Sequence, residues 1–206
     1  MYTKLSQTIS SLPFERLSAE RMEILQPFID YLRHHIQNHR PINLNFICTH
    51  NSRRSILAQI WAQTLAYYFK IDQVYCYSGG TEATAVFPKV VQTLHSHGFE
   101  VYTFSNEDNL VYAIKCDKNL PAMISFSKEY SHFFNPTSDF TAIMTCNHAD
   151  EVCPVVNGAD ARFSINYDDP KVYDDTTWMD LKYQERSLEI ANEMYYLFSQ
   201  LQIHKN

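Results

Sequence analysis

Glycine is scarce in this chain, because its 206 residues include only four glycines. They are Gly79, Gly80, Gly98 and Gly158, and we expect each to mark a turn with backbone angles that other residues avoid. Long apolar runs are also missing, since no stretch reaches the roughly 18 residues that a membrane-spanning helix needs. The segment Met1–Gln7 lacks the apolar core of a signal peptide. We therefore expect neither a membrane protein nor an exported one.

An excess of positive charge is missing as well. The chain has 17 Lys and Arg against 23 Asp and Glu, which gives a net charge of -6. No global positive field exists to attract nucleic acid or anionic lipid, so we expect no partner of either kind. A small anionic substrate would need a local positive site. Length and composition, with 45% hydrophobic residues, predict one globular domain with a full core.

The chain has five cysteines: Cys48, Cys76, Cys116, Cys146 and Cys153. An odd number without an export signal argues against a disulfide scaffold and favours a reducing cytoplasm, in which any disulfide is transient and catalytic. Cys76 and Cys116 stand inside apolar strand patterns, and we interpret both as small buried hydrophobic residues. The other three thiols remain candidates for chemistry.

The first half of the chain alternates strand and helix patterns. Ser18 can cap a helix whose apolar residues recur at helical spacing. Gly98 is a typical residue to end the last helix of this half. The alternating order favours a parallel sheet with helices on its faces. The predicted elements are a helix from Ser18 to about 36, a strand at 42–47, a helix at about 53–69, a strand at 73–77 and a helix at about 84–97.

The second half is less regular. Short strands at 111–115 and 122–126 read as a hairpin or insertion, and apolar runs at 141–145 and 163–167 read as core strands. A long helix follows from about 177. We predict an α/β fold, a parallel four-stranded sheet flanked by helices, with an N-terminal helical extension at 1–40. Residues 41–206 would form the α/β domain, with an insertion at about 106–139.

The strongest motif lies between the first predicted strand and the following helix. Cys48 is followed by five residues and then by Arg54 and Ser55. A strand-to-helix turn points successive backbone N–H groups into one concavity, and the helix N-terminus adds positive potential, so such a loop binds a tetrahedral oxyanion. The planar guanidinium of Arg54 can donate two hydrogen bonds to oxygens of the anion. The same field favours a Cys48 thiolate placed for in-line attack, to which Ser55 could donate a hydrogen bond.

The segment Ile47–Ser55 resembles the oxyanion-binding loop of the low-molecular-weight protein tyrosine phosphatases and of the thioredoxin-coupled arsenate reductases with the same fold. The resemblance covers about residues 42–200. It includes Tyr77-Ser78-Gly79-Gly80 after the second strand, Pro88 and Gly98 around the next helix, and the pair Asp169-Pro170. It implies an enzyme without metal or cofactor, in which Cys48 is the nucleophile. The implied substrate-binding residues are Thr49, His50, Asn51, Ser52, Arg53 and Ser55.

The resemblance also assigns a general acid. A leaving oxygen needs a proton when its bond breaks. On residues alone, Asp168-Asp169-Pro170-Lys171 is equally well an ordinary turn. The family places the acid directly before proline, which selects Asp169 rather than Asp168.

A second pair of cysteines separates the two activities of the fold. Cys146 and Cys153 stand seven apart after a core strand, with Pro154 next. Their spacing is poor for zinc, but it resembles the redox segment of the arsenate reductases. The resemblance implies that Cys48 attacks arsenate and that Cys146 then attacks Cys48 and releases arsenite. Cys153 next moves the disulfide to Cys146–Cys153, which thioredoxin reduces. This order requires segment 146–153 to be mobile.

Three positions depart from the family pattern. His50 replaces the usual glycine, Arg53 replaces a smaller residue, and Gln59 replaces a glutamate that helps to hold potassium in the reductases. The leading hypothesis is arsenate reduction with thioredoxin as reductant. The alternative is a low-molecular-weight tyrosine phosphatase that hydrolyses aryl phosphates through a phosphocysteine, with Asp169 as acid and then base. A third hypothesis is a non-catalytic oxyanion or phosphopeptide binder, which the intact set of Cys48, Arg54 and Asp169 disfavours.

Overall fold

The computed structural model describes residues 1–202. Its main sheet has four parallel strands in the order β2-β1-β6-β7. The predicted parallel four-stranded sheet is therefore confirmed. The strands are β1 (Ile42–Cys48), β2 (Val74–Gly80), β6 (Phe140–Met144) and β7 (Ala159–Ser164).

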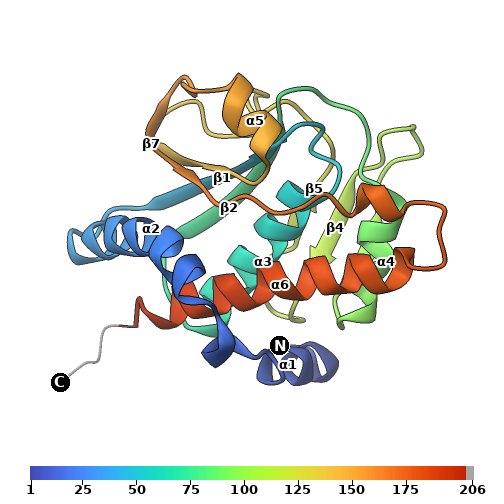
Figure 1. The fold of residues 1–206 in the computed structure, drawn as a ribbon, viewed down its shortest axis with the longest axis horizontal. Helices are drawn as coiled ribbons and strands as arrows, with labels where there is room; N and C mark the ends of the chain where they lie inside the picture. The colour runs from blue at the N-terminus through green and yellow to red at the C-terminus, as the bar shows by residue number, and fades with distance from the viewer. Residues whose placement is uncertain (203–206) are drawn as a thin grey trace.

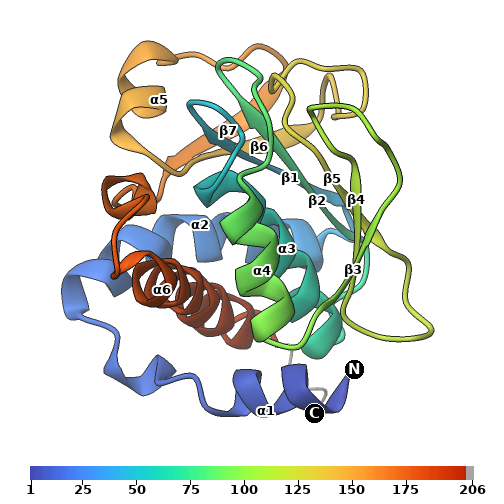
Figure 2. The same ribbon diagram turned by 90° about the vertical axis from the view of Figure 1, so that its right-hand side faces the viewer.

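Burial explains why the two central strands form. Six of the seven residues of β1 and all five of β6 are buried, as expected for parallel strands covered on both faces. Helix α3 (Arg54–Tyr68) makes the crossover from β1 to β2 and lies beside the long α6 (Met179–Ser199) (Figures 1 and 2). The buried Trp61 joins these two helices, because its indole N–H donates to Ser187 Oγ at 2.9 Å.

The parallel arrangement decides where a site can form. The carboxyl ends of β1, β6 and β7 lie at the same end of the sheet, so the segments that follow these strands lie close together there. The short helix α5 (Asn147–Val152), which follows β6, lies at this end, and the N-terminus lies at the opposite end (Figure 1).

The N-terminal segment is helical, as predicted. Ser18 caps α2 (Ala19–Gln37), because its hydroxyl accepts from the backbone N–H of Arg21 at 3.2 Å. Two shorter elements, α1 (Thr3–Ser10) and the 3-10 turn η1 (Phe14–Arg16), were not predicted. Leu5 and Ile9 of α1 are buried, so this helix packs one apolar face against the core.

A second, antiparallel sheet has the order β3-β4-β5 and is formed by β3 (Glu100–Thr103), β4 (Tyr112–Lys115) and β5 (Met123–Ser125). The predicted hairpin corresponds to β4 and β5, whereas β3 was not predicted. The helix predicted from about 84 begins later, as α4 (Pro88–Ser96), with proline at its first turn. It ends before Gly98, whose φ of +103° confirms the special backbone angle expected there, whereas Gly79 and Gly80 lie in β2 without a positive φ, so the same expectation was wrong for them.

The last predicted strand is displaced. We predicted residues 163–167, but β7 covers Ala159–Ser164, because the pairing with β6 begins at Phe140 and Ala159. The segment after Ser164 leaves the sheet and leads into the 3-10 turn η2 (Pro170–Tyr173). Because β7 ends at Ser164, Asp168 and Asp169 lie beyond the strand, at the same end of the sheet as Cys48.

His97 makes the fold sensitive to acid. Burial, with a smaller contribution from Lys4, lowers the pKa of His97 to about 4, and its ring lies against Trp61 at 5.9 Å between centroids. The unfolded chain binds this proton with a pKa of about 6.5. The contribution of the neutral His97 side chain to the free energy of unfolding is therefore present above pH 6.5. It is lost as the pH drops from 6.5 towards 4, by up to about 3 kcal/mol.

His97→Phe should keep the ring contact and remove this part of the acid sensitivity. We expect the free energy of unfolding of the wild type, measured in urea at pH 7, 5.5 and 4.5, to fall more steeply than that of the variant. Equal slopes for the two proteins would contradict this explanation.

Candidate active site

The loop between β1 and α3 is shaped by its own polar side chains. Asn51 has a φ of +46°, a left-handed conformation that asparagine tolerates. Its amide donates to Ser55 Oγ at 2.8 Å and accepts from the backbone N–H of Lys128 at 3.1 Å. Gly80 at the end of β2 lies so close that a Cβ there would stand 2.6 Å from Thr49 O and 2.8 Å from Asn51 N. The loop therefore needs both the asparagine and the glycine.

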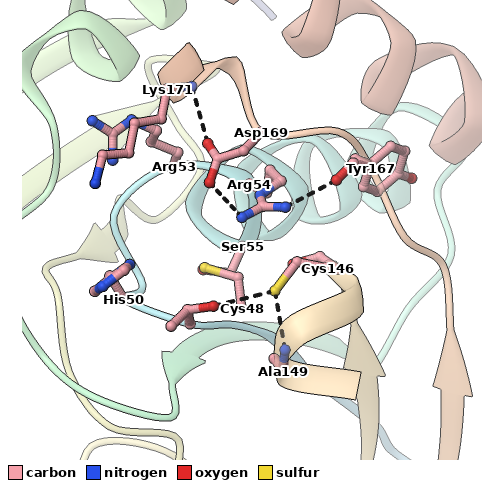
Figure 3. Close-up of polar contacts among 12 residues, drawn as sticks. Cys48, His50, Arg53, Arg54, Ser55, Cys146, Ala149, Tyr167, Asp169 and Lys171 are labelled. Carbon is pink, nitrogen blue, oxygen red and sulfur yellow. Dashed lines mark hydrogen bonds and ion pairs between the residues drawn. The ribbon is translucent and has the colours of Figure 1, made fainter. Parts of the chain in front are cut away.

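The sulfur of Cys48 lies at the centre of this loop (Figure 3). Ser55 Oγ is 3.1 Å from Cys48 Sγ. Because Ser55 Oγ already accepts from Asn51, its own proton is free to point at the sulfur, as the sequence predicted. Cys48 is 3% exposed and stands before the N-terminus of α3.

Arg54 and Asp169 meet across the site. One terminal nitrogen of Arg54 donates to Asp169 Oδ2 at 2.6 Å and the other to Tyr167 O at 3.0 Å (Figure 3). The buried Nε of Arg54 has no hydrogen-bond partner among residues 1–202. Asp169 also accepts from the backbone N–H of Lys171 at 3.0 Å. The side chain of Asp168, in contrast, is 98% exposed and lies near Arg186, so the structure brings only Asp169 to the arginine.

The other side chains of the loop have partners outside the centre. Ser52 Oγ donates to Ala85 O at 2.6 Å. The guanidinium of Arg53 donates to Tyr183 OH and Asp174 Oδ2, both at 2.6 Å, and lies 4.1 Å from the centroid of the Phe87 ring. Ser52 and Arg53 can therefore offer an anion their backbone N–H groups, while their side chains tie the loop to the scaffold.

His50 and Thr49 contact different neighbours of the loop. His50 Nε2 is 3.1 Å from Glu82 Oε1, and both side chains are exposed to solvent. Thr49 Oγ1 is 3.5 Å from Cys146 Sγ, which links the loop to the second candidate thiol.

Cys146 is the N-cap residue of α5, a helix that the sequence did not predict. Its sulfur accepts from the backbone N–H of Ala149 at 3.4 Å. Cys146 and Cys48 belong to one buried cluster, against which the partly exposed Cys153 packs. Cys153 is the C-cap of α5, so the two cysteines stand at opposite ends of one helix. A rise of about 1.5 Å per residue separates their Cα atoms by roughly 10 Å.

Burial makes the thiols of Cys76 and Cys116 unreactive. Both side chains are buried, as expected from the sequence. Burial raises the pKa of Cys116 to about 11 and that of Cys76 further. Neither thiol ionises near neutral pH.

Gln59 occupies a fully bonded position beside β2. Its amide nitrogen donates to Cys76 O at 3.2 Å and Ile124 O at 3.1 Å, and its oxygen accepts from the hydroxyls of Ser78 and Ser125. The amide thus uses both of its donors and both acceptor positions of its oxygen. Among the described residues, no group of three or more His, Cys, Asp or Glu side chains is arranged to hold a metal ion.

The insertion supports the loop from outside, which the sequence did not reveal. Ser127 Oγ donates to His50 O and accepts from Thr84 N, both at 2.8 Å. Gly80 N donates to Lys128 O at 2.8 Å, and Tyr130 N returns a bond to Gly80 O at 2.9 Å. Residues 127–130 therefore extend the edge of β2 and hold the loop through main-chain contacts.

Lys128 in this segment is buried, and its ammonium lies 4.5 Å from the centroid of the Phe126 ring. Burial lowers the pKa of Lys128 to about 7. No ion pair of Lys128 exists within residues 1–202, so the segment is held mainly by its backbone.

Ser127→Ala should weaken anion binding without unfolding the protein. The change leaves Thr84 N without its partner and leaves His50 O with only the 3.4 Å bond from Thr84 Oγ1, in a half-exposed position, at a cost of about 1 kcal/mol. We expect an inorganic phosphate dissociation constant, measured calorimetrically, that is about tenfold higher. Ser138→Ala, in an exposed part of the same insertion, serves as control, and equal affinities in both variants would remove Ser127 as a support.

No helix in the described part of the chain is long and apolar enough to cross a membrane.

Comparison with known proteins extends these observations. No family model matches the chain. Arsenate reductase 2 of Staphylococcus haemolyticus is 29% identical over 125 residues, which cover 61% of this chain and 76% of the relative, and an arsenate reductase of Staphylococcus epidermidis is 28% identical over the same length.

Among solved structures, a low-molecular-weight protein tyrosine phosphatase of T. tengcongensis aligns with a TM-score of 0.52 at 14% identity, covering 78% of this chain and 99% of the other. A YwlE mutant from Bacillus subtilis aligns with a TM-score of 0.51 at 15% identity, covering 78% and 98%. These structural alignments establish the fold, and the curated relatives show a sequence similarity to arsenate reductases. The resemblance inferred from the sequence is thus confirmed: the chain has the low-molecular-weight phosphatase fold and is similar to arsenate reductases and to the tyrosine phosphatases that share this fold.

Proposed function

We propose that the protein reduces arsenate to arsenite through a relay of Cys48, Cys146 and Cys153, with thioredoxin as the reductant. One observation carries this proposal: Cys146 lies in the same buried cluster as the nucleophile and caps a helix that ends at the partly exposed Cys153. Hydrolysis of a phosphate ester has no use for either thiol. The curated relatives named arsenate reductase support the same choice.

The first step uses the loop and Arg54. Backbone N–H groups of residues 49–54 and the guanidinium hold the arsenate, and the Cys48 thiolate attacks arsenic. A sulfur–arsenic bond forms, an arsenic–oxygen bond breaks, and the leaving oxygen takes a proton from Asp169 to depart as water. The bound anion competes with Asp169 for Arg54.

The second step transfers the electrons. The Cys146 thiolate attacks Cys48 Sγ, a Cys48–Cys146 disulfide forms, and the sulfur–arsenic bond breaks with its electron pair on arsenic, which leaves as arsenite. The backbone N–H of Ala149 donates to the Cys146 sulfur and holds it at the N-terminus of α5.

The third step needs a change of shape. A disulfide requires Cα atoms within about 7 Å, whereas Cys146 and Cys153 are roughly 10 Å apart along α5. The helix must therefore unwind before Cys153 can attack Cys146. The new Cys146–Cys153 disulfide would lie at the exposed end of the segment, where thioredoxin can reduce it. A reducing cytoplasm is the compartment that supplies this partner.

Phosphatase activity is the alternative, because Cys48, Arg54 and Asp169 form a complete set without the other two thiols. There Cys48 would form a phosphocysteine with an aryl phosphate, and Asp169 would protonate the leaving phenol and then activate water. The solved tyrosine phosphatases of this fold support this candidate.

Disulfide mapping separates the two functions. Reduced protein is incubated with arsenate, its free thiols are alkylated, and the peptides are analysed by mass spectrometry. We expect an arsenate-dependent Cys146–Cys153 bond in the wild type, and a trapped Cys48–Cys146 bond in Cys153→Ser. Steady turnover of an aryl phosphate that survives Cys146→Ser and Cys153→Ser, without any arsenate-dependent bond, would identify the protein as a phosphatase.

The acid and the arginine should each contribute to the first step. Asp169→Asn removes the proton donor, and we expect the rate of the first single turnover to fall about 10²–10⁴-fold. Arg54→Lys keeps the charge but loses the planar fork, so it should raise the phosphate dissociation constant strongly. Asp168→Asn is the matched control, and a loss as large as that of Asp169→Asn would move the acid to Asp168.

A further inference from the structure

Helix α5 has little of its own to hold it together. Of its six residues, only Ala149 is buried, and Val152 is 51% exposed. A helix this short does not persist in water without contacts from outside. Its N-terminal end is held by the Cys146 sulfur, which accepts from the backbone N–H of Ala149.

Arg162 on β7 holds the C-terminal end. Its Nε donates to Cys153 O at 3.1 Å and one terminal nitrogen donates to Asp150 O at 2.8 Å. Carbonyl groups in the last turn of a helix lack partners within the helix, and a cation there also matches the helix dipole. One arginine thus binds two main-chain oxygens of the α5 segment, including that of the resolving cysteine.

The same arginine forms an ion pair with the Asp150 carboxylate. This carboxylate also accepts from Ser164 Oγ at 2.6 Å and from Asn166 Nδ2 at 3.2 Å, so Asp150 is bound by three residues of β7 and the segment after it. Burial acts to raise the pKa of Asp150, but the bonds from Ser164, Asn166 and Arg162 outweigh it and lower the pKa. Asp150 therefore stays ionised and paired at neutral pH.

We propose that Arg162 and Asp150 are positioning residues that latch α5 in its helical form, keep Cys153 away from Cys146, and so control the third step. This inference rests on the proposed relay. The first disulfide removes the N-terminal cap, because the Cys146 sulfur must turn from Ala149 N to Cys48. The latch is then the main polar tie of the segment. When it opens, the Cys153 thiolate attacks Cys146 Sγ, a Cys146–Cys153 bond forms, and Cys48 leaves as a thiolate, with no net gain of electrons.

Hydrogen exchange tests the latch without any substrate. The amides of Asp150 and Cys153, which bond Cys146 O and Ala149 O, report the opening of α5. In reduced Arg162→Met we expect them to exchange about tenfold faster than in the wild type, the effect of losing a charge-assisted bond at a partly exposed position. Arg33→Met is the matched control, since Arg33 binds Gln200 O at the end of α6 and should not change exchange in α5.

Thiol oxidation tests whether the latch controls the approach of the two cysteines. In a Cys48→Ser background, diamide takes two electrons and two protons from Cys146 and Cys153 as their disulfide forms. We expect Arg162→Met to make this oxidation about tenfold faster, and Arg162→Lys to bring the rate partly back to that of the Cys48→Ser background. Adding Asp150→Asn to Arg162→Met should not increase the rate further. A defect of general stability would not follow this pattern of rescue and non-additivity.

The relay itself gives the last measurement. With arsenate and otherwise wild-type thiols, Arg162→Met should form the Cys48–Cys146 bond at an unchanged rate and convert it to Cys146–Cys153 about tenfold faster. Unchanged exchange and unchanged diamide oxidation in Arg162→Met would overturn the latch. Faster exchange and faster oxidation, with no arsenate-dependent disulfide in any variant, would support the latch and reject the relay.

Discussion

The hydrogen-bond chain from Asn51 through Ser55 to the sulfur of Cys48 is the constraint on which the site depends. Asn51 uses its donor on Ser55, and this frees the hydroxyl proton for Cys48. The same asparagine takes the left-handed turn that bends the loop around the sulfur. One residue therefore sets both the curvature of the loop and the orientation of the group that stabilises a thiolate. The turn also explains why β2 must end in glycine, since a side chain at Gly80 would collide with the loop.

Rigidity is distributed unevenly around this centre. On one side, Arg53 is fixed by Tyr183, Asp174 and the face of Phe87, and the insertion adds the bonds of Ser127. On the other side lies α5, with one buried residue and polar ties at its two ends. An oxyanion site gains from donors that are fixed before the anion arrives, whereas a resolving thiol has to move by several ångströms. The two requirements fall on segments that follow different strands, β1 and β6.

The sequence predicted the centre of the site because its signals are local. The strand at 42–47, the helix after it and the spacing of Cys48, Arg54 and Ser55 all lie within about thirty residues, and the structure has the strand and helix there. Helix α5 was missed because six mostly exposed residues have no apolar period. Ser127 was missed for another reason: its partners, His50 and Thr84, lie more than 40 residues away in the chain. Bonds between distant segments leave no pattern in either one.

The proposed relay requires that the five thiols of the chain differ in their reactivity. Exchange needs a thiolate and an approach to another sulfur. Cys76 and Cys116 are denied the first, because burial raises their pKa values. Cys48 and Cys146 stand after neighbouring strands and share one buried cluster, which brings the two sulfurs to the same end of the sheet. Cys153 is denied only the approach, since α5 holds it at the far end of the helix. Burial therefore keeps Cys76 and Cys116 unreactive. Cys153 is held away from Cys146 by α5, a restraint that local unwinding of the helix would remove.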